Sequence, residues 1–183
     1  MGGREDAQPR PFADADALAA VIIVHAIAGD SDSRFAFTEI HDMPTRTASA
    51  SWKGGLRGGT GTFKGQTGLS GSYSFGSRFE NASGSNPEEL LAAAEAACYS
   101  MALSAALERG GTAATSVDTT AHCTIDKVGE GFKVTKMRLE VRAVVPKIDA
   151  AEFRKIAEAT KESCPISQVM KGNVPIELDA KLA

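Results

Sequence analysis

The sequence predicts an α+β domain with the order βββ–α–ββ–α–α–β. Two observations carry this prediction. Glycine-punctuated segments with aromatic residues come before a long Ala-rich run, and strictly alternating apolar and polar residues come after it. Strands and helices that come in runs are typical of α+β folds, whereas doubly wound sheets alternate them. We expect the domain to cover residues 43–183 and residues 1–42 to form an extension.

Composition limits the class of partner. The chain has 183 residues, enough for one domain with a substantial apolar core. Its hydrophobic content of 43% and charged content of 23% are those of an ordinary globular protein. The net charge is −3, and no run of Lys and Arg forms the basic patch that nucleic acid or an anionic membrane requires. We therefore expect neither as a partner.

The extension contains one apolar stretch, at residues 17–27. The tripeptide Ala26-Ile27-Ala28 resembles a signal-peptide cleavage site. However, acidic side chains outnumber basic ones before the stretch, and a secretory leader needs the opposite. The stretch is also too short to cross a bilayer. We favour a helix that begins at Asp14 or Asp16 and ends before Gly29.

Residues 45–77 are expected to form a three-stranded meander. Paired glycines at 54–55 and 58–59, together with Gly65, divide this segment into short runs. Its strand-favouring aromatic residues are Trp52, Phe63, Tyr73 and Phe75.

The central helix is predicted for residues 86–109. Asn86 is a good N-cap, Pro87 suits the first turn, and Glu88 and Glu89 complement the positive end of the helix dipole. Glycines at 110–111 end it. Its alanines indicate close packing on more than one side. The residues expected on one face are Leu91, Ala94, Cys98, Met101 and Ala105.

The remaining elements follow from alternation and capping. Residues 115–145 predict an antiparallel hairpin that turns at 129–131, with a change of parity near Thr135 that indicates a β-bulge. Asp149 caps a second helix, and Pro165 begins a short third one. A closing strand is expected over residues 174–182, which completes an antiparallel sheet against which the central helix packs.

The three cysteines exclude two kinds of site. Their odd number excludes a disulfide-stapled secreted scaffold, and the lack of C-x-x-C pairs excludes common zinc sites. We expect a reducing compartment, the cytoplasm. Cys123 is on the apolar face of a strand and is typical of core packing. A metal site that pairs it with His122 fails because neighbours on a strand point to opposite faces. We predict no metal and no cofactor.

Cys98 and Cys164 allow two interpretations. Cys98 in an Ala-rich helix is typical of packing. Cys164 precedes Pro165 at the start of a helical turn, where free N–H groups and the positive helix end favour a thiolate. From the residues alone, packing and reactivity both stay open.

Four motifs in order resemble the OsmC (osmotically inducible protein C) family: SRFE at 77–80, NPEELL at 86–91, AACYSMAL at 96–103 and CPISQV at 164–169. The segment SVDTTA at 116–121 belongs to the same pattern. The resemblance covers residues 45–182, and the extension is the unmatched part.

The resemblance implies a thiol peroxidase that reduces organic hydroperoxides. It implies Cys98 as the peroxidatic thiolate and Cys164 as the resolving thiol, with Arg78 stabilising the thiolate and Glu88 orienting Arg78. An external dithiol, of lipoyl type, would reduce the Cys98–Cys164 disulfide. We expect an apolar substrate pocket, which favours bulky peroxides over hydrogen peroxide. Its candidate residues are Phe79, Met101, Tyr73, Phe75 and Leu91.

The family also implies an intertwined homodimer with its sites at the subunit interface. We expect the helical extension to pack on that dimer, so that deletion of residues 1–42 lowers stability more than turnover. The competing hypothesis is a stress-induced binding or scaffolding protein that keeps the fold but leaves its cysteines unpaired.

Glu95 does not fit the expected thiol site. It lies three residues before Cys98, and a carboxylate facing the thiol would raise the pKa of that thiol. We therefore expect Glu95 to point away, toward solvent or a basic partner.

Overall fold

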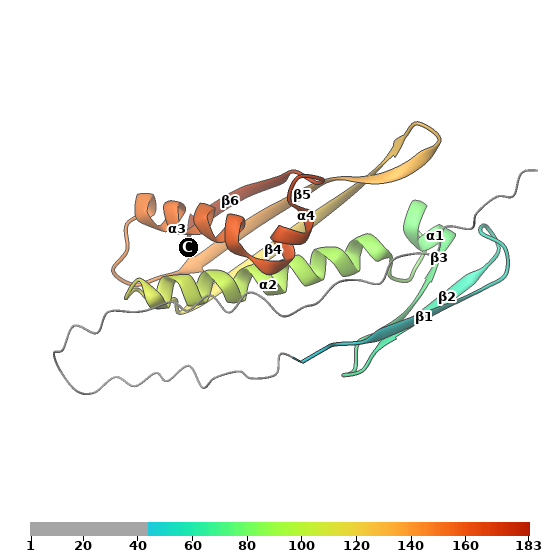
Figure 1. Ribbon diagram of the computed structural model, residues 1–183, viewed down its shortest axis with the longest axis horizontal. Helices are drawn as coiled ribbons and strands as arrows, with labels where there is room; N and C mark the ends of the chain where they lie inside the picture. Colours follow the sequence, from blue (N-terminus) through green and yellow to red (C-terminus); the bar gives the residue numbers. More distant parts are fainter. Residues whose placement is uncertain (1–43) are drawn as a thin grey trace, which may run out of the picture. The chain divides into compact units, whose positions relative to one another are not determined.

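The computed structural model describes residues 44–183, and residues Thr45–Ala183 form one compact unit (Figure 1). The helix expected within residues 1–42 lies outside the described residues. The unit contains two three-stranded sheets, one from each half of the sequence, and four helices.

The first sheet is the predicted meander. Strands β1 (Ala48–Lys53), β2 (Thr60–Gly65) and β3 (Ser70–Ser74) pair antiparallel in the order β1-β2-β3. The ring of Tyr73 lies across Gly61, and that of Phe63 lies across Gly71, so a side chain at either glycine would collide with a ring. The two cross-strand pairs make one face aromatic and leave hydroxyl groups on the other.

A short helix, α1 (Phe75–Phe79), follows β3 directly. We expected Phe75 to belong to the last strand, and this was wrong. Ser74 is the N-cap of α1: its hydroxyl accepts from the N–H of Ser77, and the hydroxyl of Ser77 accepts from the N–H of Ser74. This reciprocal cap stops the strand and begins the helix that carries Arg78.

Helix α2 (Pro87–Arg109) begins where the sequence predicts, and Asn86 accepts a hydrogen bond from the N–H of Glu89. Its buried stripe is not the expected face. The buried residues of α2 are Glu88, Glu95, Tyr99, Leu103 and Leu107, whereas Ala94 and Met101 are exposed. Helix α2 is long and apolar enough to cross a membrane by length and composition, and its buried stripe packs on β4, α3 and α4.

The second sheet has the order β4-β5-β6. Strands β4 (Ser116–Val128) and β5 (Gly131–Val144) form the predicted hairpin. Pairing moves from Thr124–Lys136 to Ile125–Val134, which leaves Thr135 unpaired and confirms the β-bulge. Strand β6 (Ile176–Leu182) pairs parallel to β5, so the prediction of a fully antiparallel sheet was wrong for this strand.

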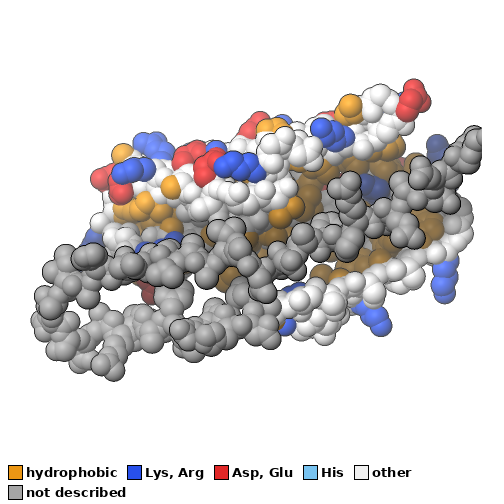
Figure 2. All heavy atoms as spheres, viewed as in Figure 1, with side chains coloured by type: hydrophobic (Ala, Val, Ile, Leu, Met, Phe, Trp, Pro, Cys, Tyr) orange, Lys and Arg blue, Asp and Glu red, His pale blue; other side chains and the backbone are white. Residues whose placement is uncertain are grey.

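The parallel strand is reached through a helical crossover, as parallel pairing requires. Helices α3 (Ala150–Ser163) and α4 (Pro165–Met170) connect β5 to β6, and Asp149 caps α3 as predicted. Side chains of α2 and α3 meet the apolar side of the sheet in one core that includes Leu139, Val141 and Phe153. In Figure 2, charged side chains of both signs lie along the edge formed by α3 and β6, and hydrophobic side chains gather toward the middle of the view.

Candidate active site

The structure brings Cys98 and Cys164 together. Their Sγ atoms lie 3.3 Å apart, and both are free thiols. Cys98 lies in the middle of α2, and Cys164 ends α3 and caps α4, so the packing of α2 on these helices creates the pair. The hydroxyl of Tyr99 donates to the carbonyl oxygen of Ala157 at 2.8 Å and ties α2 to α3 beside it. A disulfide of about 2.04 Å needs only a small movement of the side chains.

The two sulfurs differ in accessibility. Cys164 is fully buried, whereas Cys98 is half-buried. A dissolved reagent can therefore reach Cys98 first, and Cys164 can react only with a group already held inside the site.

Burial raises the pKa of the Cys98 thiol. A hydrogen bond with the backbone of Ile166, in the first turn of α4, lowers it, while negative charge on Cys164 or Glu95 raises it further. The hydrogen bond between the two sulfurs also raises the pKa of Cys98.

Arg78 and Glu88 form a two-point ion pair. Nη2 of Arg78 lies 2.7 Å from Oε1 of Glu88, and Nε donates to both carboxylate oxygens at 3.2 Å. Glu88 is buried, with 7% of its surface exposed, and a third of the Arg78 side chain is exposed. A buried carboxylate that accepts hydrogen bonds from both Nε and Nη2, along one edge of the guanidinium, fixes its orientation.

Within one chain, this ion pair does not serve the thiol. Glu88 precedes Cys98 on α2 by about 15 Å along the helix axis. Among the groups of the described chain that shift the pKa of Cys98, none is a cation. Arg78 of the same chain therefore supplies no positive charge to Cys98, whose pKa is raised in the single subunit, and the expected stabilisation of the thiolate by Arg78 stays a prediction.

The apolar residues proposed for the substrate pocket do not all gather. Tyr73, Phe75 and Phe79 line a hollow of about 260 Å³ together with Arg78. Phe79 packs against Phe75 with ring centroids 5.0 Å apart and the rings tilted by 45°, and the Arg78 guanidinium lies 5.1 Å from the centre of the Phe79 ring. Leu91 instead packs against the core, and Met101 is 73% exposed on α2.

Glu95 is buried rather than solvent-facing, so our expectation for it was wrong. None of its surface is exposed, and the hydroxyl of Ser167 donates to its Oε1 at 2.6 Å. Ser167 belongs to α4, far from Glu95 in the sequence, which is why local pattern did not reveal the contact. The signal that was available is spacing: Glu95 and Cys98, and likewise Cys164 and Ser167, are three residues apart.

Comparisons with known proteins assign the family. The sequence pattern described as OsmC-like protein matches residues 80–179. Peroxiredoxin OsmC of Escherichia coli is 43% identical over 138 residues, which cover 74% of this chain and 96% of that protein. The chain belongs to the OsmC family.

More distant relatives of this OsmC-family chain carry related names. The organic hydroperoxide resistance protein of Xanthomonas axonopodis pv. citri is 31% identical over 98 residues, 52% of this chain and 66% of that protein. The crystal structure of the organic hydroperoxide resistance protein OhrB of Bacillus subtilis superposes with a TM-score of 0.59 at 25% identity. It covers 74% of this chain and 98% of that one. The predicted fold class is confirmed.

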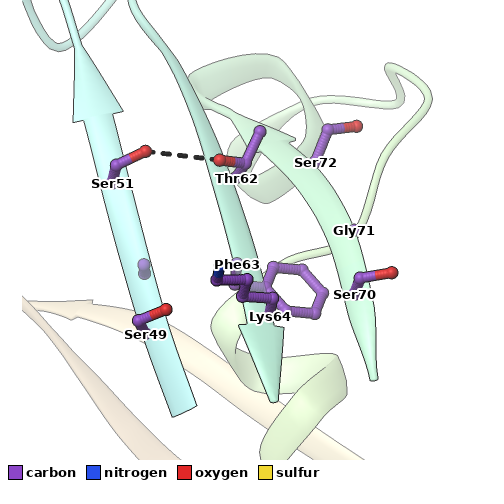
Figure 3. A pocket seen from close by; sticks show the side chains of 9 residues that line it. Ser49, Ser51, Thr62, Phe63, Lys64, Ser70, Gly71 and Ser72 are labelled. Atoms are coloured by element: carbon purple, nitrogen blue, oxygen red, sulfur yellow. Dashed lines mark hydrogen bonds between the residues drawn. The ribbon is translucent and has the colours of Figure 1, made fainter. Parts of the chain in front are cut away.

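A hollow larger than the aromatic one lies away from the thiols. It measures about 630 Å³ and lies on the hydroxyl face of β1, β2 and β3 (Figure 3). Ser49, Ser51, Thr62, Ser70 and Ser72 line it, and Ser51 and Thr62 are hydrogen-bonded to each other at 3.3 Å. Its lining has neither an activated nucleophile nor an acid, so size alone does not identify the reactive site.

The described part of this chain also contains no cluster of three or more His, Cys, Asp or Glu side chains that could hold a metal ion. Cys123 packs against the core, and burial raises the pKa of its thiol, with the charge of Glu88 adding to the effect.

Proposed function

We propose that this protein is a thiol-dependent peroxidase that reduces organic hydroperoxides to alcohols in defence against oxidative and osmotic stress. The observation that carries the proposal is the pair of free thiols, Cys98 and Cys164, with sulfurs 3.3 Å apart. The names of the relatives, peroxiredoxin OsmC and organic hydroperoxide resistance protein, support a peroxidase activity.

The cycle assigns one step to each cysteine. The thiolate of Cys98 attacks the peroxide oxygen, the O–O bond breaks, and Cys98 becomes a sulfenic acid while the alcohol leaves. Cys164 then attacks the sulfur of the sulfenic acid, and the hydroxyl group leaves as water with a proton. The result is a Cys98–Cys164 disulfide. An external dithiol, a lipoyl-type compound by family resemblance, reduces it by exchange.

The accessibility of the two sulfurs supports this division. Half-buried Cys98 can meet a substrate, and buried Cys164 is protected from direct oxidation. A resolving thiol held inside the fold is positioned to react with Cys98 before a second peroxide does, which protects Cys98 from irreversible over-oxidation.

We infer that the site is completed by a second copy of the chain. The single subunit leaves Cys98 without a cation, while Arg78 is held in a hollow lined by Tyr73, Phe75 and Phe79. In a symmetric dimer, Arg78 of the partner subunit and its apolar hollow would face Cys98. The guanidinium would then stabilise the thiolate, and the aromatic walls would favour an organic peroxide.

The exposed side of α2 supports such a dimer. Ala93, Ala97 and Met101 follow one another at helical spacing, and all three are exposed. Small side chains allow a second surface to approach closely, and Met101 adds an adaptable apolar contact next to Cys98. We place the dimer in the cytoplasm, where a reducing environment keeps thiols free.

The direct test is a peroxidase assay with cumene hydroperoxide and dihydrolipoamide. Cys98→Ser should lose turnover, because its hydroxyl is not ionised near neutral pH, and Cys123→Ser should keep it. Full turnover in Cys98→Ser would rule out the mechanism. A wild-type protein that folds and dimerises but consumes no peroxide would instead favour the binding or scaffolding role.

A further inference from the structure

Glu95 is a buried acid that the cycle above does not use. It lies one helical turn before Cys98 on α2, and none of its surface is exposed. Ser167, one turn after Cys164 on α4, donates to its Oε1 at 2.6 Å. The carboxyl group therefore bridges the two elements that carry the reactive thiols.

The other carboxyl oxygen is unsatisfied. Oε2 of Glu95 is buried and has no hydrogen-bond partner among the described residues. The titratable and charged groups that interact around it are Cys98 and Tyr99 of α2, Cys164 at the start of α4, and Glu158 of α3, which acts on Tyr99. None of these is a cation. An ionised carboxylate in such a place is costly, so the group holds its proton while the Cys98 thiolate adds a second negative charge beside it.

The charge states of Glu95 and Cys98 are coupled. Burial raises the pKa of Glu95 even though the Ser167 hydrogen bond lowers it, and an ionised Glu95 raises the pKa of Cys98. Coupling of this kind is reciprocal, so a Cys98 thiolate makes Glu95 hold its proton more tightly. When oxidation makes Cys98 neutral, that repulsion vanishes. Tyr99 stays protonated throughout, because burial raises its pKa well above the usual value.

We propose that Glu95 stores the proton of the reaction: it holds the proton while Cys98 is a thiolate, yields it when Cys98 is oxidised, and regains it when the disulfide is reduced. This inference rests on the proposed peroxidase function. The alkoxide that leaves the peroxide needs a proton. A protonated carboxyl one helical turn from Cys98 can supply it without a proton from water.

In the oxidation, the number of protons is the same before and after the reaction. Cys98 thiolate, Cys164 thiol, protonated Glu95 and a hydroperoxide give the disulfide, ionised Glu95, one alcohol and one water. Two electrons pass from the two sulfurs to the O–O bond, and no proton is taken from solution. In the reduction, a dithiol supplies two hydrogens: one returns to Cys164, the other to Glu95, and Cys98 leaves as a thiolate.

The test counts protons in a single turnover. Reduced protein in weak buffer with a pH indicator receives one equivalent of cumene hydroperoxide, and disulfide is measured by thiol titration of the same sample. The pH is set where the rate of alkylation shows that Cys98 is ionised in both the wild type and Glu95→Gln, because a Cys98 thiol in the wild type would by itself give no proton uptake. We expect no net proton uptake by the wild type. Glu95→Gln keeps an oxygen for Ser167 but holds no proton to give, so it should take up about one proton per disulfide.

Two further variants complete the design. Ser167→Ala removes the hydrogen bond that favours ionised Glu95, so Glu95 should stay protonated in both the reduced and the oxidised protein. Proton uptake should then again approach one proton per disulfide. This variant provides the test if Glu95→Gln does not fold. Glu108→Gln, at the exposed end of α2, should behave as the wild type. Equal proton uptake by the wild type and by a folded Glu95→Gln or Ser167→Ala overturns the inference. Failure of the wild type to form any disulfide overturns the peroxidase proposal itself, and the inference with it.

Discussion

The hydroxyl of Tyr99 donates a 2.8 Å hydrogen bond to the backbone carbonyl of Ala157, and both residues are fully buried. The bond joins α2 to α3 one residue after Cys98. Tyr99→Phe should lower the free energy of unfolding by about 1–3 kcal/mol, because it leaves the carbonyl oxygen without a partner inside the core. Urea unfolding of the reduced protein measures this. Tyr73→Phe, in the half-buried face of the first sheet, is the control for losing a tyrosine hydroxyl, and an equal loss in both variants would contradict the assignment.

Cys164→Ser should stop the cycle after its first step. Without a resolving thiol at 3.3 Å, the sulfenic acid on Cys98 persists and can be trapped with dimedone, while steady turnover with a dithiol falls at least tenfold. Mass spectrometry of the Cys98 peptide measures the adduct. The matched control is Cys123→Ser, which keeps both reactive thiols and should form the disulfide instead. A variant lacking Cys164 that turns over normally would show that another thiol resolves the intermediate.

The shared site makes a prediction about mixed dimers. Cys98→Ser and Arg78→Met should each lose activity by about 10²-fold or more, because one lacks the nucleophile and the other lacks the cation. A heterodimer purified with two different tags then holds one intact site, formed by Cys98 of one subunit and Arg78 of the other. Its activity should be roughly half that of the wild-type dimer.

Complementation of this kind separates two geometries. If Arg78 acted on Cys98 of its own chain, every site of the heterodimer would lack one of the two groups. No activity above the level of the single variants would then return, and the dimeric site would have to be abandoned.

The proposed contact between the exposed side of α2 and a second subunit can be tested by measuring the mass of the protein in solution. Ala97→Arg places a charge on the proposed interface and should weaken the dimer by about 100-fold or more, because the charge would be buried without a partner. Light scattering coupled to gel filtration reports the mass. Ala159→Arg is the matched control: it is the same substitution at an exposed helical position, but on α3. Dimers of equal stability in both variants would place the interface elsewhere.

Local signals in the sequence were sufficient for most of the fold. Asn86 and Asp149 began their helices as expected, and the change of parity at Thr135 correctly located the bulge. Each of these features depends on residues that are neighbours in the chain. Helix α1 was missed because its cap uses two serines, Ser74 and Ser77, rather than the usual serine and glutamate.

Long-range contacts explain the remaining errors. The parallel pairing of β6 depends on the path of the α3–α4 crossover. The alternation of residues within a strand carries no information about that path. Glu95 was expected to face solvent because a charged residue in a helix usually does. Its partner, Ser167, comes from another element, and only the packing of α4 on α2 brings the two together. The same packing joins Cys98 to Cys164, a pairing that the residues alone left open.

The buried Glu95 should also make stability depend on pH. Burial raises its pKa in the folded protein above the usual value of 4.5, which holds in the unfolded chain. Below that value the carboxyl is neutral in both states and costs nothing. As the pH rises above it, the unfolded chain loses the proton and the folded protein keeps it, so stability falls by up to about 1.4 kcal/mol per pH unit until the folded pKa is passed.

Glutamine does not titrate, so Glu95→Gln should gain stability relative to the wild type as the pH rises through this window. Urea unfolding of both reduced proteins, from acid to neutral pH, measures the difference. Glu108→Gln controls for the loss of one negative charge from α2 at an exposed position. A difference between Glu95→Gln and the wild type that is independent of pH would mean that Glu95 does not titrate differently in the folded and unfolded states. The buried carboxyl would then be ionised in the fold, and its proton could not be stored there.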